Sequence, residues 1–321
     1  MTEKKKILLT GATGYVGGKL LEQLENQGHE VHCLVRDATK MKTKGVHTKI
    51  FQGDVLERST MWKAFQGVDT AYFLIHFLDE KQDFEAKEIL AAKNFAYMAK
   101  GAGVKRIVYL GALGNQHDTL SPHLKSRQDV GYVLRESGIP TIELRASIVL
   151  GQGSLSFDLI RDLTEHLPIM VFPRWVTTKA QPIGIRDLLD YLVQSLDVPI
   201  EHAEIVEIGG ADRMSYGELM REFARQRGLI RFMIPVPVLT PWLSSHWISF
   251  FSKVDLTVAR KLIEGIRNPT VVESRRASTL FSIEPVSAKV AMSEAVIGET
   301  ISKPETVTLF EQDVSAHVQA A

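Results

Sequence analysis

The sequence lacks the features that mark several classes of protein. Its 321 residues include one cysteine, Cys33, which cannot form a disulfide or a cysteine metal site within a single chain. The 38 basic and 38 acidic residues cancel, so nucleic acid is not expected as the main partner. No apolar signal region opens the chain, because Lys4–Lys6 lead directly into the first apolar run. These absences favour a globular protein of the reducing cytoplasm.

Charged residues are also missing from one long stretch, residues 232–252. Its length raises the question of a membrane span, but Pro235, Pro237 and Pro241 interrupt it, so no spanning helix is expected. We expect a wall of an apolar substrate pocket instead. The less favoured alternative is peripheral membrane contact through four aromatic side chains. These are Trp242, Trp247, Phe250 and Phe251.

The sequence is organised around residues 6–18, where an apolar run, Ile7–Thr10, predicts a buried strand. Gly11, Gly14 and Gly17 follow, and leucines at helical spacing come next. Strand, glycine turn and helix are typical of a dinucleotide-binding unit rather than a plain turn. Gly11 permits the turn, Gly14 admits a pyrophosphate, Gly17 packs the helix closely, and the helix N-terminus offers N–H groups to the phosphates. The intervening residues expected at the site are Thr13, Tyr15 and Val16.

Strands and helices alternate over the first 150 residues. Strands are expected at 31–35, 48–52, 71–75, 107–110 and 141–144, with helices at 84–100 and 121–137. The alternation predicts an α/β protein, a Rossmann fold with a doubly wound parallel sheet and its ligand at the carboxyl ends of the strands.

The pattern loosens after residue 150, and a second, smaller C-terminal α/β substrate domain is expected from residues 151–181 and 209–300. Within it, helices are expected at 157–167 and 215–228, separated by a loop at 168–178. A helix at 182–196 and a strand at 203–208 are expected to return to the first domain, residues 1–150. Residues 301–321 are polar and are predicted to form a loosely held tail.

The residue after the second strand bears on the choice of cofactor. NAD enzymes of this fold usually place a carboxylate at the end of this strand to hold the ribose 2′-hydroxyl. Here the strand ends at Val35 and Arg36 follows. An arginine can pair with a 2′-phosphate, which a carboxylate would repel, so NADP(H) is predicted rather than NAD(H). A solvated arginine at a strand end is the alternative.

The ends of the next two strands supply further candidates. Asp54 could reach the adenine amino group or cap the helix that follows. His76 ends the fourth strand and could line a nicotinamide pocket, or could be an ordinary core or loop histidine. Val55, Leu74 and Ile75 are expected to line the cofactor site.

Three stretches carry a family resemblance, namely Thr10–Gly17, Gly53–Val55 and Leu144–Ala146. They resemble the extended and atypical short-chain dehydrogenase/reductases, and especially the NmrA-like branch, which also places Arg directly after the second strand. The resemblance covers about residues 5–210 with firm motifs. It implies NAD(P) bound in the Rossmann domain and a small-molecule substrate in the C-terminal domain.

The chain departs from this family at its usual catalysts, a Ser or Thr after the fifth strand and Tyr-x-x-x-Lys on the next helix. Gly111–Leu113 has no hydroxyl, and Tyr132 is followed four residues later by Glu136. His123 and Arg127 stand at the start of that helix instead. This is similar to an atypical subgroup with His-x-x-x-Arg in place of Tyr-x-x-x-Lys, in which a role for these residues rests on analogy.

His123 and Arg127 share one helix face, because they are four residues apart. Arg127 could anchor ribose or phosphate but cannot exchange protons near neutral pH. The helix dipole and Arg127 both disfavour an imidazolium, so His123 is expected to be a neutral imidazole that donates a hydrogen bond to a substrate carbonyl. The alternative is two polar residues without a catalytic role. Arg174 and Trp175 could wall a substrate pocket, and no metal site is indicated.

Three functions therefore stay open. The leading one is an NADP(H)-dependent oxidoreductase that reduces a small apolar carbonyl or quinone-like compound. The alternative is a non-catalytic NADP(H)-binding redox sensor or assembly protein, for which NmrA-like proteins and an accessory subunit of respiratory complex I are precedents. A sugar-nucleotide epimerase ranks third, because the family's epimerases use the missing Tyr and Lys. No oligomeric state is predicted.

Overall fold

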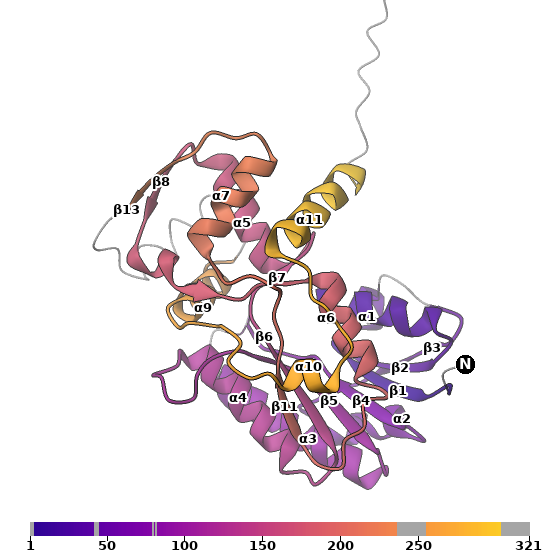
Figure 1. Ribbon diagram of the computed structural model, residues 1–321. Helices are drawn as coiled ribbons and strands as arrows, with labels where there is room; N and C mark the ends of the chain where they lie inside the picture. Colours follow the sequence, from indigo (N-terminus) through magenta and orange to yellow (C-terminus); the bar gives the residue numbers. More distant parts are fainter. Residues whose placement is uncertain (1–2, 42–44, 79, 81, 236–254, 303–321) are drawn as a thin grey trace, which may run out of the picture.

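The computed structural model describes residues 3–41, 45–78, 80, 82–235 and 255–302. Seven parallel strands form its central sheet, in the order β11-β6-β5-β4-β1-β2-β3 (Figure 1). The strands are β1 (Lys6–Thr10), β2 (Glu30–Val35), β3 (Thr48–Gln52), β4 (Thr70–Phe73), β5 (Arg106–Ala112), β6 (Thr141–Ala146) and β11 (Glu204–Glu207). The order reverses between β1 and β4, which opens a crevice there. The predicted Rossmann sheet is confirmed.

Helices cover both faces of the sheet because the side chains of each strand alternate. Ile7 and Leu9 of β1 pack in one apolar cluster with α1 and α6, and Leu8 packs in the other with α2 and α3. Contacts also join α3 to α4 and α1 to α6, so the sheet is doubly wound. These helices are α1 (Tyr15–Asn26), α2 (Trp62–Phe65), α3 (Phe84–Gly101), α4 (Pro122–Arg135) and α6 (Ile185–Gln194).

The helix that carries His123 begins as its sequence predicts. The Ser121 hydroxyl accepts a hydrogen bond from the backbone N–H of Leu124 (3.3 Å), and Pro122 occupies the first turn. His123 therefore lies in the first turn of α4, next to the carboxyl end of β5.

A third apolar cluster is built mainly from helices α5 (Leu155–His166), α7 (Tyr216–Gln226), α9 (Leu256–Ile266) and α11 (Ala288–Ser302). In Figure 1 these helices lie beyond the carboxyl ends of the central strands. The capping box suggested by Ser215 and Glu218 forms at the start of α7. The described helices and loops therefore close over the edge of the sheet where a ligand is expected.

The prediction of a loop at 168–178 is wrong in part. Residues 169–172 form strand β8 (Ile169–Phe172), which pairs in parallel with β13 (Phe232–Pro235), and residues 174–177 form a short 3-10 helix, η3 (Arg174–Thr177). The prolines that flank this apolar run favoured a loop, and its partner strand is about sixty residues away. Pairing between distant strands leaves no local pattern in a sequence.

Several predicted boundaries also shift. The fourth strand ends at Phe73, before Leu74 and Ile75. The helix expected from 182 starts at Ile185, because β10 (Ile183–Gly184) pairs with β7 (Val149–Leu150). The strand expected at 203–208 is β11 and pairs with β6. The division into domains stays a prediction.

The C-terminal helix α11 runs to Ser302, past the predicted start of the tail, and the rest of that segment lies outside the described residues. The same holds for the four aromatic residues considered for membrane contact. Within the described ranges, no helix combines the length and apolarity needed to cross a bilayer.

Candidate functional site

The glycine turn between β1 and α1 forms the floor of the site. Gly11 has a left-handed backbone (φ +77°), and a Cβ built on it would lie 2.6 Å from the carbonyl oxygen of Leu74. A Cβ on Gly17 would lie 2.1 Å from the carbonyl oxygen of Gly11. Gly14 is the N-cap of α1 and has no side chain to cap it, so the first N–H groups of α1 stay available. The turn therefore fits a pyrophosphate.

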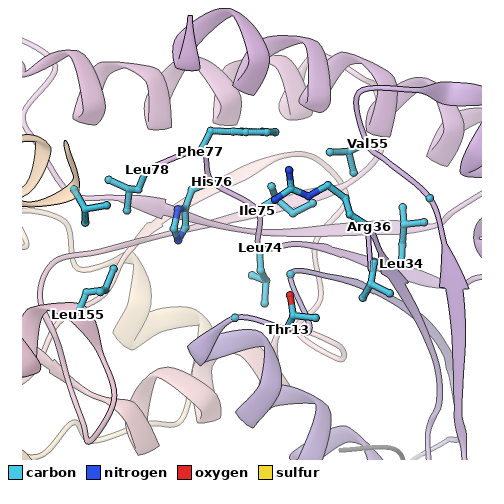
Figure 2. Close-up of a pocket in the computed structure, with 15 residues that line it drawn as sticks. Thr13, Leu34, Arg36, Val55, Leu74, Ile75, His76, Phe77, Leu78 and Leu155 are labelled. Atoms are coloured by element: carbon cyan, nitrogen blue, oxygen red, sulfur yellow. The ribbon is translucent and has the colours of Figure 1, made fainter. Parts of the chain in front are cut away.

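A cavity of about 340 Å³ opens above this turn, at the ends of β1, β2 and β4 (Figure 2). In Figure 2, Arg36 lies at one end of the cavity, whereas His76 and Leu155 lie at the other. The predicted residues that line it are Gly11, Thr13, Gly14, Arg36, Val55, Leu74, Ile75 and His76. Eight of the predicted residues, from four separate stretches of chain, therefore meet in one place.

The charges at the end of β2 suit a phosphate better than a ribose hydroxyl. Among the described residues no hydrogen bond or ion pair engages the Arg36 guanidinium, which extends into the cavity (Figure 2). The neighbouring carboxylate of Asp37 accepts hydrogen bonds from the Thr39 N–H (2.9 Å) and hydroxyl (2.6 Å), which lower its pKa. Asp37, the acidic residue nearest Arg36 in the sequence, is therefore hydrogen-bonded within its own loop.

Asp54 does not line this cavity. Its carboxylate accepts a hydrogen bond from the backbone N–H of Leu56 (2.9 Å), and its own N–H donates to the Thr60 hydroxyl (2.9 Å). These contacts close the local turn, whereas the two roles expected for Asp54 were contact with adenine and a cap on the helix that follows.

A second cavity, of about 260 Å³, adjoins the first and extends to the ends of β5 and β6. The two share Gly11, Gly14, Leu74, His76, Leu78 and Leu155, and we call them together the cleft. Tyr15, Val16 and Gly17 line its second part, as do His123 and Arg127. The cleft therefore runs from Arg36 past the glycine turn to His123.

The Arg127 guanidinium is engaged by the protein itself. It is buried and donates hydrogen bonds to the carbonyl oxygens of Ile75 (3.0 Å) and Leu110 (2.6 Å), which follow β4 and lie in β5. It also lies 3.8 Å from the buried carboxylate of Glu88 and stacks on the Tyr109 ring. These contacts tie two strand ends together, whereas the sequence analysis expected contact with ribose or phosphate. The expected role in cofactor binding stays a prediction.

His123 is the unusual titratable group of the site. Burial lowers the pKa of its imidazole to about 3, and the positive charge of Arg127 adds to this, followed by His76 and Lys261. Its Nδ1 atom is buried and has no hydrogen-bond partner in the described part of the chain. His123 is therefore a neutral imidazole near neutral pH, with a polar atom left for a ligand.

Three contacts from the C-terminal region hold the loops of the site, and sequence reasoning missed all three. The Lys261 ammonium, on α9, donates to three backbone carbonyls of the loop after β4. The Asn268 side chain bonds the Ser121 N–H (3.1 Å) and the Thr119 carbonyl (2.9 Å), just before α4. The Thr270 hydroxyl bonds that of Ser147 (2.6 Å), after β6. We call residues 256–270 the α9 strap.

The side chains of two predicted pocket residues lie outside the described part of the structure. Arg174 and Trp175 belong to η3, but the structure does not describe their side chains. Across the described ranges, no three His, Cys, Asp or Glu side chains are grouped as a metal site would require.

Comparison with known proteins places this cleft in a family. Residues 3–162 match the model of the NmrA-like family. Over 282 residues the chain is 22% identical to a UDP-glucose 4-epimerase of Vibrio cholerae, which covers 78% of this chain and 84% of the epimerase. Over 226 residues it is 24% identical to an NAD(P)H azoreductase of Xenophilus azovorans, which covers 69% of this chain and 74% of the azoreductase.

The fold is similar to that of a solved reductase. A triphenylmethane reductase from Citrobacter sp., complexed with NADP(H), superposes with a TM-score of 0.71 at 18% identity, over 90% of this chain and 99% of the reductase. NAD(P)-dependent reductases and epimerases are thus both found among the similar proteins. The predicted resemblance to the atypical short-chain dehydrogenase/reductases is confirmed, because residues 3–162 match the model of the NmrA-like family.

Proposed function

We propose that this chain is an NADP(H)-dependent reductase of a small, uncharged carbonyl or quinone-like compound. The observation that carries the proposal is one continuous cleft with a cation, Arg36, that no described residue pairs at one end and a neutral, partly buried imidazole, His123, at the other. The first suits the 2′-phosphate of NADP(H), and the second suits an uncharged acceptor of a hydrogen bond. An NAD(P)H azoreductase and a triphenylmethane reductase complexed with NADP(H) are among the similar proteins.

Different residues of the cleft would bind different parts of NADP(H). The N–H groups at the start of α1 and the open glycine turn would hold the pyrophosphate, and Arg36 would hold the 2′-phosphate. Arg127 keeps the ends of β4 and β5 at a fixed separation, which fixes the width of the cleft between them. Bound NADPH supplies a hydride.

His123 would act on the substrate oxygen. A neutral imidazole can donate a hydrogen bond from one ring nitrogen and polarise a carbonyl without carrying charge. As the oxygen gains negative charge, that proton can move to it while the other nitrogen takes a proton from a solvent molecule, so the imidazole stays neutral. Such a donor contributes about 10²- to 10⁴-fold in rate.

The experiment is a screen of NADPH oxidation against quinones, azo and triphenylmethane dyes, and aldehydes. We expect turnover of at least one uncharged compound, and a loss of about 10²-fold or more in His123→Ala with NADPH affinity unchanged. His117→Ala is the matched control, because this exposed histidine lies on the loop before α4. Full activity in a folded His123→Ala variant would exclude the assigned role.

A second function, an NADP(H)-binding sensor without turnover, is favoured by one observation. Arg127 is engaged by the backbone, and neither His123 nor Arg127 reproduces the acidity of a Tyr–Lys pair. The same screen separates the two functions. Tight NADPH binding without oxidation of any compound would favour the sensor.

A further inference from the structure

A third cavity, of about 130 Å³, adjoins the cleft at His123. It lies between α4, α9 and the carboxyl ends of β5 and β6, and α7 contributes Tyr216. Ala112, His123, Ala146 and Ser147 line both this cavity and the second part of the cleft. His123 therefore stands at the boundary between the cleft and this cavity, which we call the chamber.

The chamber has a mainly apolar lining, and its polar groups other than the Nδ1 atom of His123 are already paired. The Ser147 hydroxyl bonds that of Thr270, and Tyr216 is hydrogen-bonded to Ser156. The ammonium of Lys261 donates to the carbonyl oxygens of Phe77, Leu78 and Glu80, at 2.6–3.2 Å. None of the described lining residues is an Asp or Glu. A cationic occupant would find no carboxylate in this lining, and for an anionic one the Lys261 ammonium already donates to three carbonyls, so the lining suits an uncharged group.

The volume limits the occupant further. A dry apolar cavity of about 150 Å³ is large enough to take benzene. A cavity of about 130 Å³ is therefore matched to one six-membered ring or a short branched chain, and not to two fused rings.

One residue leaves this space open. Gly265 lies on α9 and lines the chamber, but it lines neither part of the cleft. Of the residues that the structure describes, a Cβ built on it would meet only the Ser121 hydroxyl, at 4.0 Å. The space beside this glycine is open, so a larger side chain at this edge of the chamber can take up room there without forcing its neighbours apart.

We propose that the chamber binds the non-reacting part of the substrate, an uncharged group no larger than one six-membered ring, and that Gly265 sets this size limit. The proposal rests on the reductase function proposed above, because it places the reacting oxygen at His123. The chamber, which lies on the side of His123 away from the cofactor, then determines which class of substrate can bind.

The test combines turnover with binding that needs no turnover. Benzaldehyde, 1-naphthaldehyde and 4-carboxybenzaldehyde are compared as substrates, and benzamide serves as an uncharged, non-reducible ring whose binding is measured by saturation-transfer NMR with NADP⁺ present. Wild type should favour benzaldehyde over the larger and the charged aldehyde, and should bind benzamide.

Gly265→Val is the decisive variant. It should raise the KM for benzaldehyde by roughly 10- to 200-fold and abolish benzamide binding, with the NADPH dissociation constant unchanged. Folding should not suffer, because valine is a better helix former than glycine. The matched control is Gly101→Val at the end of α3, where an added Cβ meets nothing within 4 Å.

The outcomes separate the two proposals. Benzamide binding that is lost in Gly265→Val supports the chamber even if no compound of the whole screen is reduced, a result that would overturn the reductase function alone. Reduction of benzaldehyde with an unchanged KM in Gly265→Val, or equal use of 1-naphthaldehyde, overturns the chamber and leaves the reductase function standing. Wild type that neither binds benzamide nor reduces benzaldehyde also overturns the chamber.

Discussion

The two ends of the cleft are built in different ways. The end that fits the cofactor comes mostly from one stretch, residues 7–76, in which a strand, a glycine turn and strand ends follow one another. The end at the chamber is assembled from α4, the residues after β6, α7 and α9, which are far apart in sequence. The first end therefore has a local sequence signature, and the second exists only in the folded protein.

The α9 strap joins the two ends. Lys261 lines the chamber, yet its ammonium holds Phe77 and Leu78, which line the cofactor part of the cleft. Asn268 holds the loop that leads to His123. Loss of the Lys261 contacts should therefore weaken cofactor binding, although Phe77 and Leu78 lie more than 170 residues away in sequence.

The largest effect is expected at the glycine turn. An alanine at Gly17 would place its Cβ 2.1 Å from the Gly11 carbonyl oxygen, so α1 must move away from β1. Gly17→Ala should abolish measurable NADPH binding and destabilise the protein by about 1–3 kcal/mol. Calorimetric titration and urea unfolding measure both.

Gly18→Ala is the matched control for this change. It alters the neighbouring residue of the same helix, but its Cβ would lie at an ordinary 3.4 Å from the Ala12 carbonyl oxygen. Stability should stay equal or rise by up to about 1 kcal/mol, because alanine favours a helix. Equal NADPH binding by the two variants would contradict the assigned role of the turn.

The next largest effect is expected at Lys261. Lys261→Met removes the donors of three carbonyls around the loop after β4, and an unpaired buried carbonyl costs about 1–3 kcal/mol. We expect a loss of about 3 kcal/mol in the free energy of unfolding. The NADPH dissociation constant should also rise, because Phe77 and Leu78 lose their anchor.

Lys125→Met provides the comparison for that measurement. Lys125 is an exposed lysine of α4, so its substitution should change neither quantity. If Lys261→Met lowers stability and leaves cofactor affinity at the wild-type value, the strap supports the fold alone and the two ends are independent.

Arg36 should show a smaller and more selective effect. A charge-assisted hydrogen bond to a phosphate contributes about 1.5–3 kcal/mol, so Arg36→Ala should raise the NADPH dissociation constant roughly 10- to 150-fold. The NADH dissociation constant should hardly change, because NADH lacks the 2′-phosphate. Fluorescence titration of both cofactors tests this, and a wild-type protein that binds them equally would remove Arg36 from this role.

The cofactor end of the cleft could be predicted from the sequence, whereas the contacts at the chamber end could not. The β1–α1 unit and the position of Arg36 were predicted because their geometry depends on neighbouring residues. Strand β8 was missed because its partner, β13, is distant and the sequence carries no record of their register. Lys261 was missed because a lysine on an amphipathic helix suggests a solvated face, whereas its acceptors are backbone carbonyls that no side-chain pattern reveals.

The sequence predicted the features of His123 only in part. Its place in the first turn of α4 followed from Ser121 and Pro122. The lowered pKa was predicted in direction from the helix dipole and Arg127, but its largest cause is burial. That burial could not be predicted, because it depends on a fold that brings α9 against α4.

The smallest effect expected is a pH dependence of stability that originates at His123. The unfolded chain protonates this imidazole near its ordinary pKa of 6.5, whereas the folded protein does so only near pH 3. Between these values the unfolded state binds the extra proton, so stability falls as pH falls, by up to about 1.4 kcal/mol per pH unit. Above pH 6.5 the contribution is fully present and constant.

His123→Gln should therefore remove about 2 kcal/mol of the loss in stability between pH 6.5 and 4.5. The measurement is the free energy of urea unfolding at both pH values, compared as a difference within each protein, so that any effect of the substitution on packing cancels. His29, whose pKa burial also lowers, is present in both proteins and cancels as well. His117→Gln should keep the wild-type difference because its side chain is exposed. If wild type and His123→Gln lose the same stability over this range, the imidazole is not desolvated in the folded protein, and a neutral donor at the chamber is excluded.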